Sequence, residues 1–160
     1  MLGHIGFSYV GFLFLLMLLI PNFIWTLKKP QDYTAENESK IFLAFERLGE
    51  ILTSCCALIF SDFNLRRWSN WSLWLVFSVI IMVMYEFWWV RYFRSERKLI
   101  DFYSSFFGIP IAGATLPVIA FFLLGIYGRV IWMLISVVIL GIGHIGIHWK
   151  HYVEEKERSR

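Results

Sequence analysis

Two acidic residues and one basic residue interrupt an apolar stretch of the chain. Glu46, Arg47 and Glu50 lie within residues 41–60, which are otherwise apolar and long enough to cross a bilayer. A charge at membrane depth costs about 3 kcal/mol even on a lenient insertion scale. Glu46 and Glu50 fall on one helix face and repel each other when both are ionised. We therefore expect a proton, a metal or a basic side chain beside them, and predict a site for a ligand, proton or cation.

A pair of histidines near the C-terminus has the spacing of a metal site. His144 and His148 are four residues apart, so a helix places both imidazoles on one side. With Glu46, Glu50 and Glu86 they could form a mixed carboxylate–imidazole site suited to zinc, iron or manganese. Glu50 is the carboxylate expected to join the two histidines as a metal ligand, although the sequence does not identify the cofactor. The alternative is that His148 and His151 touch lipid headgroups while His144 bonds to a backbone carbonyl.

Five apolar blocks must position these residues. Of the 160 residues, 58% are hydrophobic and 17% are charged, whereas soluble domains have about 45–50% and 25%. Each block has about the 20 residues that a helix needs to span a bilayer. The sequence therefore predicts a single-domain, all-α integral membrane protein, a bundle of five transmembrane helices. The predicted helices are residues 5–25, 41–60, 72–90, 106–127 and 130–149, and the last extends into a charged tail.

Lysine and arginine residues predict the orientation of this bundle. Five crossings place the loops at about residues 26–39 and 91–104 and the C-terminus on one side, which holds most of the basic residues. The opposite side holds Arg66, Arg67 and Arg129. Because basic loops stay in the cytoplasm, we predict the N-terminus outside and the C-terminus inside a bacterial-type cytoplasmic membrane. A four-crossing alternative makes residues 41–60 an interfacial helix.

The predicted topology brings the polar residues to one level. At 1.5 Å per residue, Glu46, Glu86 and His144 each lie roughly 8 Å from the inner end of their helices, and Glu50 roughly 14 Å. All therefore fall in the cytoplasmic half, facing a shared interior. The residues expected to join them are Tyr85, Arg47 and Arg91.

The remaining features have simpler interpretations. The net charge of +3 comes from basic residues at block ends, which indicates contact with the lipid bilayer and argues against nucleic acid. Tryptophans at the block ends, including Trp88 and Trp89, are expected in interfacial belts. Residues 108–117 contain two prolines and two glycines, which predicts a broken or kinked helix that could expose backbone groups to an ion or substrate.

These observations leave three functional hypotheses. The first is a carrier, sensor or accessory subunit that binds a small ligand, proton or cation at Glu46, Glu50 and Glu86 with the histidines. The second is a membrane enzyme, metal-dependent and acting on a lipid or another hydrophobic substrate. The third is a structural subunit whose charges only fix helix packing. A homo-oligomer or a larger membrane complex is compatible with each of them.

Overall fold

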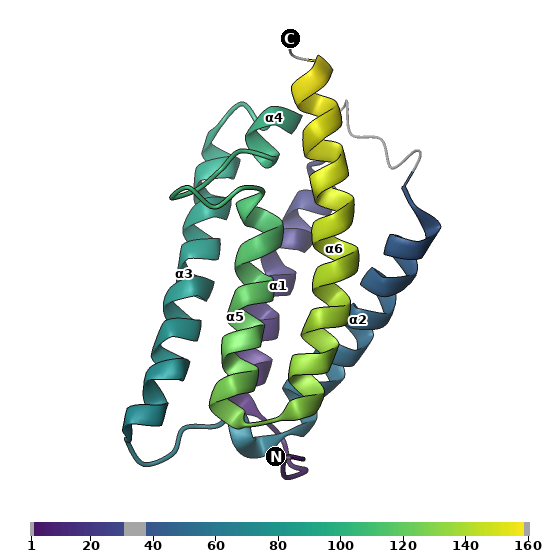
Figure 1. The fold of residues 1–160 in the computed structure, drawn as a ribbon. Helices are drawn as coiled ribbons and strands as arrows, with labels where there is room; N and C mark the ends of the chain where they lie inside the picture. The colour runs from purple at the N-terminus through teal and green to yellow at the C-terminus, as the bar shows by residue number, and fades with distance from the viewer. Residues whose placement is uncertain (1, 31–37, 159–160) are drawn as a thin grey trace.

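The computed structural model describes residues 2–30 and 38–158, and these residues form an all-helical bundle (Figure 1). The long helices are α1 (Tyr9–Leu27), α2 (Lys40–Ile59), α3 (Leu73–Arg94), α5 (Ala112–Gly128) and α6 (Ile131–Arg158). The short helices are η1 (Ser61–Phe63), η2 (Asn70–Ser72) and α4 (Leu99–Phe102). Each of the five apolar blocks of the sequence thus contains one long helix.

Three of the helical segments are long and apolar enough to cross a membrane. They are Tyr9–Leu27, Asn70–Arg94 and Ile131–Glu157. Helix α5 is apolar but has only 17 residues, and α2 contains the charged residues Glu46, Arg47 and Glu50. Length and composition therefore make this a plausible helical membrane protein.

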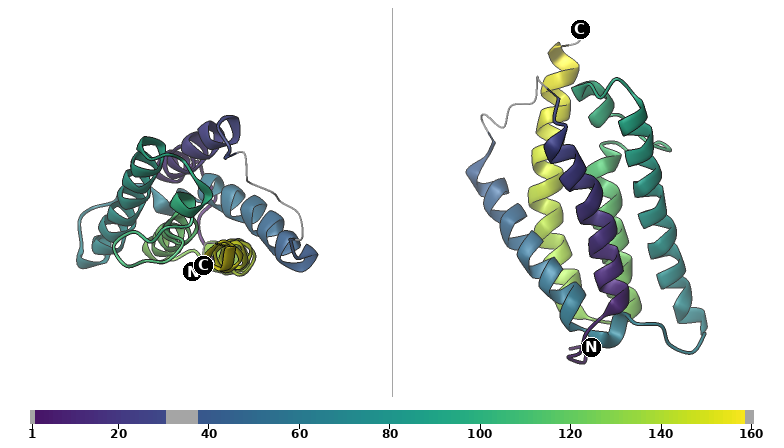
Figure 2. Two further views of the ribbon diagram at one scale, coloured as in Figure 1. Left: turned by 90° about the horizontal axis from the view of Figure 1, so that it is seen from above. Right: turned by 180° about the vertical axis from the view of Figure 1, so that it is seen from behind.

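The helices alternate in direction. In Figure 1 the chain starts at the lower end of the bundle, and α1, α3 and α6 run from there to the upper end. Helices α2 and α5 run back down. Helix α5 packs between α3 and α6, α6 packs along α2, and α1 lies behind, against α2 and α3 (Figure 2). Phe14 of α1 and Phe121 of α5 meet edge to face in the core, at 5.9 Å between ring centroids.

Glycines bring the backbones of α2 and α6 into contact. A Cβ added to Gly143 would lie 2.2 Å from the backbone nitrogen of Glu46, and one on Gly49 would lie 2.3 Å from Cα of Leu140. Neither position has room for a side chain, so the two helices approach as closely as small residues permit. Gly143 and Gly49 therefore lie where α6 and α2 are in closest backbone contact.

The segment before α1 is held against the end of α2 at the lower end. The amide of Gly6 donates to the carbonyl of Ile59 at 2.8 Å, and the His4 imidazole lies 2.9 Å from Asp62. Burial opposes ionisation of Asp62, but hydrogen bonds from the amide and ring of His4 outweigh it, so the pKa of this carboxyl is below its usual value. These contacts hold the segment, and with it the start of α1, against the end of α2 and against η1.

The fourth block is helical over a shorter range than predicted. Helix α5 begins at Ala112 rather than near residue 106, because the preceding residues form a tight turn with paired Phe106 and Ile109 backbones. Gly108 and Ile111 have positive φ angles there. The break expected from the Gly- and Pro-rich segment therefore lies before the helix, and Pro117 lies inside it.

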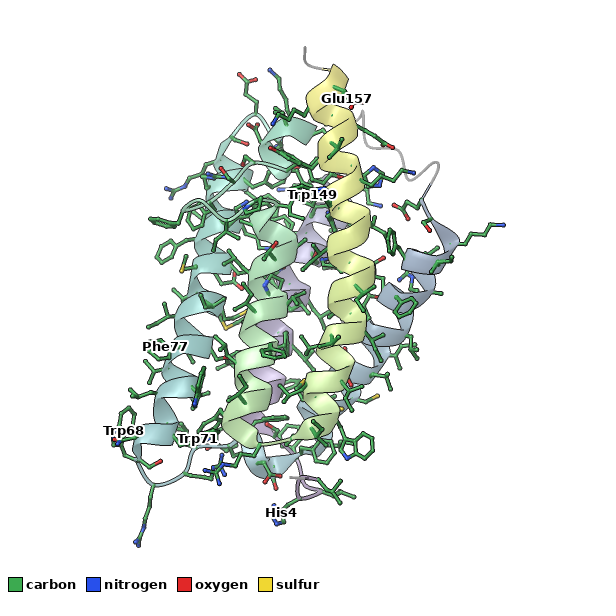
Figure 3. The ribbon with its side chains drawn as sticks, viewed as in Figure 1. His4, Trp68, Trp71, Phe77, Trp149 and Glu157 are labelled. Atoms are coloured by element: carbon green, nitrogen blue, oxygen red, sulfur yellow. The ribbon has the colours of Figure 1, made fainter. Side chains whose placement is uncertain are left out.

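Two tryptophans predicted for an interfacial belt are instead buried. Trp88 is fully buried and Trp89 is 3% exposed, because residues of α4 fold back over the end of α3. Phe102 of α4 meets both indole rings, at 5.6 Å from Trp88 and 6.1 Å from Trp89. Trp68 and Trp149, labelled near opposite ends of the bundle in Figure 3, are exposed as a belt requires.

Candidate functional site

The shortest contact between polar side chains of α2 and α6 joins Glu46 to His144. Oε1 of Glu46 lies 2.6 Å from Nδ1 of His144, and the two side chains are 14% and 24% exposed. Gly143 positions this pair, because it lets the α2 backbone approach α6 at Glu46 itself. The residue that permits close packing and the residue that carries the imidazole are therefore neighbours in sequence.

His148 lies one helical turn above His144. Their ring centroids are 4.5 Å apart and the rings are inclined at 66°. One ligand atom from each of Glu46, His144 and His148 lies within 4.8 Å of the other two. We call these three residues the Glu–His cluster. They offer one carboxylate and two imidazole nitrogens, donors that suit a proton or a transition metal.

Aromatic side chains contact the His148 ring on the side away from His144. Its ring lies 5.8 Å from Phe102 and 6.0 Å from Tyr103, measured between centroids. Both residues belong to the α4 turn that also covers Trp88. The imidazole of His148 is therefore fixed on one side by aromatic packing and on the other by His144.

A second polar group, which includes His151, lies higher on the same face of α6. Nε2 of His151 lies 3.3 Å from Glu38, and its Nδ1 lies 3.7 Å from Glu154. The ring of Tyr103 stacks on His151, with centroids 6.2 Å apart. The spacing of His144, His148 and His151 predicts that all three lie on one helix face, whereas the contribution of Glu38 depends on how the chain enters α2.

Glu50 lies outside the Glu–His cluster. It pairs with Arg47 at 3.4 Å, and the two side chains are 46% and 72% exposed. Glu50 lies one helical turn from Glu46 on α2. The carboxylate that groups with His144 and His148 is thus Glu46, whereas the predicted metal set contained Glu50.

The other predicted site residues lie around α3 and do not join the cluster. The hydroxyl of Tyr85 accepts a hydrogen bond from the Asn22 amide at 2.7 Å. Oε1 of Glu86 is buried with no hydrogen-bond partner in the described part of the chain. Arg91 donates to the Ser105 carbonyl at 3.1 Å and to the Ser104 hydroxyl. Arg91 therefore stabilises the loop before α5 and does not pair with Glu86 or another predicted acidic site residue.

The Glu46–His144 contact can hold one proton in two ways. A protonated imidazole beside a carboxylate forms a charge-assisted hydrogen bond, and a neutral imidazole donates from Nδ1 while Nε2 accepts. His148 extends the pair by a second nitrogen base. The cluster can therefore take up or release a proton, or exchange it for a metal ion.

No protein-family model, curated protein or solved structure matches the chain.

Proposed function

We propose that this chain is a five-span protein of the cytoplasmic membrane that binds a proton or a small cation at the Glu–His cluster. In this proposal the upper end of the bundle faces the cytoplasm and the N-terminus faces outward. Basic residues gather in the loops and tail of the upper end, as cytoplasmic loops require. The cluster then lies in the cytoplasmic half of the bilayer, where carriers and sensors could exchange ions with the cell interior.

Helix α2 fits a membrane span in spite of its charges. Its 20 residues extend about 30 Å, which is the thickness of the hydrocarbon core. Glu46 is paired with His144, and Arg47 with Glu50, so each of these charges has a partner of opposite or titratable character. Intramembrane charges that pair in this way are typical of ion and proton pathways.

The observation that carries the proposal is the 2.6 Å contact between Glu46 and His144. A role in packing α2 against α6 alone would need only this one hydrogen bond. It does not need His148, whose ring lies beside His144 and adds a further nitrogen to the same small space. Three titratable groups at one helix contact support reversible ion binding, and the His151 group provides polar residues between the cluster and the upper end.

The experiment is proton titration of the histidines, observed by NMR on imidazole-labelled protein in detergent micelles. We expect the His144 and His148 signals to shift together with pH in the wild type, and Glu46→Gln to change both titrations. Glu50→Gln is the matched control, since its carboxylate lies outside the cluster, and it should preserve their coupling. A Glu46→Gln variant that remains folded with both histidine titrations unchanged would contradict the proposal.

The topology is tested separately by reporter fusions. A cytoplasmic reporter after Arg160 should be active, and a periplasmic one at the same position should be inactive. The opposite result would place the cluster in the outer half of the bilayer and remove the proposed cytoplasmic access.

A further inference from the structure

We infer that the cation bound by the Glu–His cluster is a divalent transition metal of the zinc class, held by Glu46, His144 and His148. This inference rests on the proposed function and names its ligand. Three features support it: the donor set, the way the backbone fixes the donors, and the charge balance.

The donors match the chemistry of a three-ligand metal site. Two imidazoles and one carboxylate bind zinc in sites that keep a fourth position for water or substrate. The same set suits iron and manganese less selectively. All three donor atoms already lie within 4.8 Å of one another, so small side-chain rotations bring them to a common ion. Glu50 lies one helical turn from Glu46 on α2 and would add negative charge near a bound ion.

Rigid elements supply the donors. The glycine contact at Gly143 fixes the backbone of Glu46 against α6, directly beside His144. His144 and His148 project from the same helix one turn apart, and Phe102 and Tyr103 limit the movement of the His148 ring. A site built in this way loses little conformational freedom when it binds a metal.

The charge balance favours exchange of a proton for a metal ion. Oε1 of Glu46 and Nδ1 of His144 lie 2.6 Å apart, so without a metal ion a hydrogen-bonding proton would lie between them. A divalent ion that binds the carboxylate and two neutral imidazoles displaces that proton, and Glu50 adds negative charge nearby. Metal binding should therefore release protons and weaken as pH falls, as is general for histidine and carboxylate sites.

The direct experiment is titration of purified, folded protein with Co²⁺ and Zn²⁺. The full chain is purified through an affinity tag without histidine, treated with chelator and returned to metal-free buffer in detergent micelles. We expect one Co²⁺ per chain with visible d–d absorption of a low-coordinate site, and displacement of Co²⁺ by one equivalent of Zn²⁺. Wild-type protein that remains folded but binds no stoichiometric metal would overturn the inference.

Matched variants locate the site. His148→Gln should raise the dissociation constant for Co²⁺ by at least about 100-fold, since even partners outside the ligand set cost about 10–100-fold. His151→Gln, a change of the same type on the same helix face, should leave the constant within a few-fold of the wild type. Equal losses in the two variants would overturn the assignment of ligands. Circular dichroism of each variant verifies that the helices remain intact.

The two proposals fail in different ways. If metal binding is absent but the histidine titrations respond to Glu46→Gln, the metal inference falls and the proton site remains. If neither metal binding nor a Glu46-dependent titration is observed in folded protein, the proposed function falls as well.

Discussion

Oε1 of Glu46 lies 2.6 Å from Nδ1 of His144, although 98 positions separate the two residues in the chain. The contact joins the second long helix to the last one at the level where both carry polar side chains. It makes the carboxylate and the imidazole one chemical unit, and it is the basis of the following predictions.

A double-mutant cycle should show that this pair stabilises the bundle. For Glu46→Gln and His144→Gln we expect a coupling free energy of about 1.5–3 kcal/mol, the range for hydrogen bonds to charged groups. The measurement is unfolding in detergent micelles by a denaturant. The control cycle combines Glu50→Gln with His144→Gln and should give less than about 0.5 kcal/mol. A control coupling as large as the first would contradict the assignment of Glu46 as the partner.

Gly143→Ala should displace α2 from α6. The new methyl group would lie 2.2 Å from the Glu46 nitrogen and 2.5 Å from the Phe42 carbonyl oxygen, so backbone must move. We expect a loss of about 1–3 kcal/mol in unfolding free energy, as for other overpacked sites. Gly141→Ala is the control, because its nearest neighbour is a methyl carbon of Val118 at 3.3 Å. Equal effects of the two variants would show that helix propensity rather than contact is responsible.

Glu50→Gln should change stability little. Arg47 is 72% exposed, so its long side chain can extend toward the headgroups without Glu50, and exchanging an exposed carboxylate for a neutral amide removes a charge that is costly at membrane depth. We expect the unfolding free energy to change by less than about 0.5 kcal/mol in micelles. A much larger loss would mean that Glu50 has a partner in the membrane-embedded protein beyond Arg47, and would favour the larger carboxylate site expected from sequence.

The lower end of the bundle should loosen in acid. Hydrogen bonds from His4 lower the pKa of Asp62, so the ionised carboxylate stabilises the fold. This contribution is fully present above the unfolded pKa of about 3.9 and is lost as pH falls through the lower, folded pKa. The protection factors of the Gly6 and Ser8 amides, which bond to the end of α2, should fall in that range once the pH dependence of intrinsic exchange is removed.

Asp62→Asn provides the corresponding test near neutral pH. This variant should have lower protection factors at the same two amides near neutral pH. These factors should not fall further as the pH drops through about 4, where free carboxylates titrate. If wild type and variant respond to acid in the same way, another group controls the segment.

Hydropathy predicted much of the helical fold, because each apolar block contains one long helix. It did not predict the burial of Trp88 and Trp89. Their place beside Arg91 is typical of an interfacial belt, but the α4 turn folds back and Phe102 covers both indole rings. That return depends on contacts between residues distant in sequence, which local composition does not encode. The belt interpretation remains adequate for Trp68 and Trp149, which are exposed.

The choice between the two α2 carboxylates could not be made from spacing. Glu46 and Glu50 differ by about 40° around the helix, so either could face α6. The structure distinguishes them through the glycine contact, which fixes α2 on α6 at Glu46. Depth alone also grouped Glu86 with the histidines. Its helix packs mainly against α5, however, and equal depth does not bring side chains on separate helices together.

The adjacency of Gly143 and His144 restricts how this sequence can change over evolution. One residue in a helix corresponds to a rotation of about 100°. An insertion or deletion between Glu46 and Gly49 would therefore turn Glu46 away from α6, and one between Leu140 and His148 would turn one or both imidazoles away from α2. The same change would place a side chain where the backbones touch. Descendants of this chain can therefore vary in loop length and in lipid-facing residues. We expect insertions and deletions to be eliminated from these two helical segments, where contact and chemistry depend on a common register.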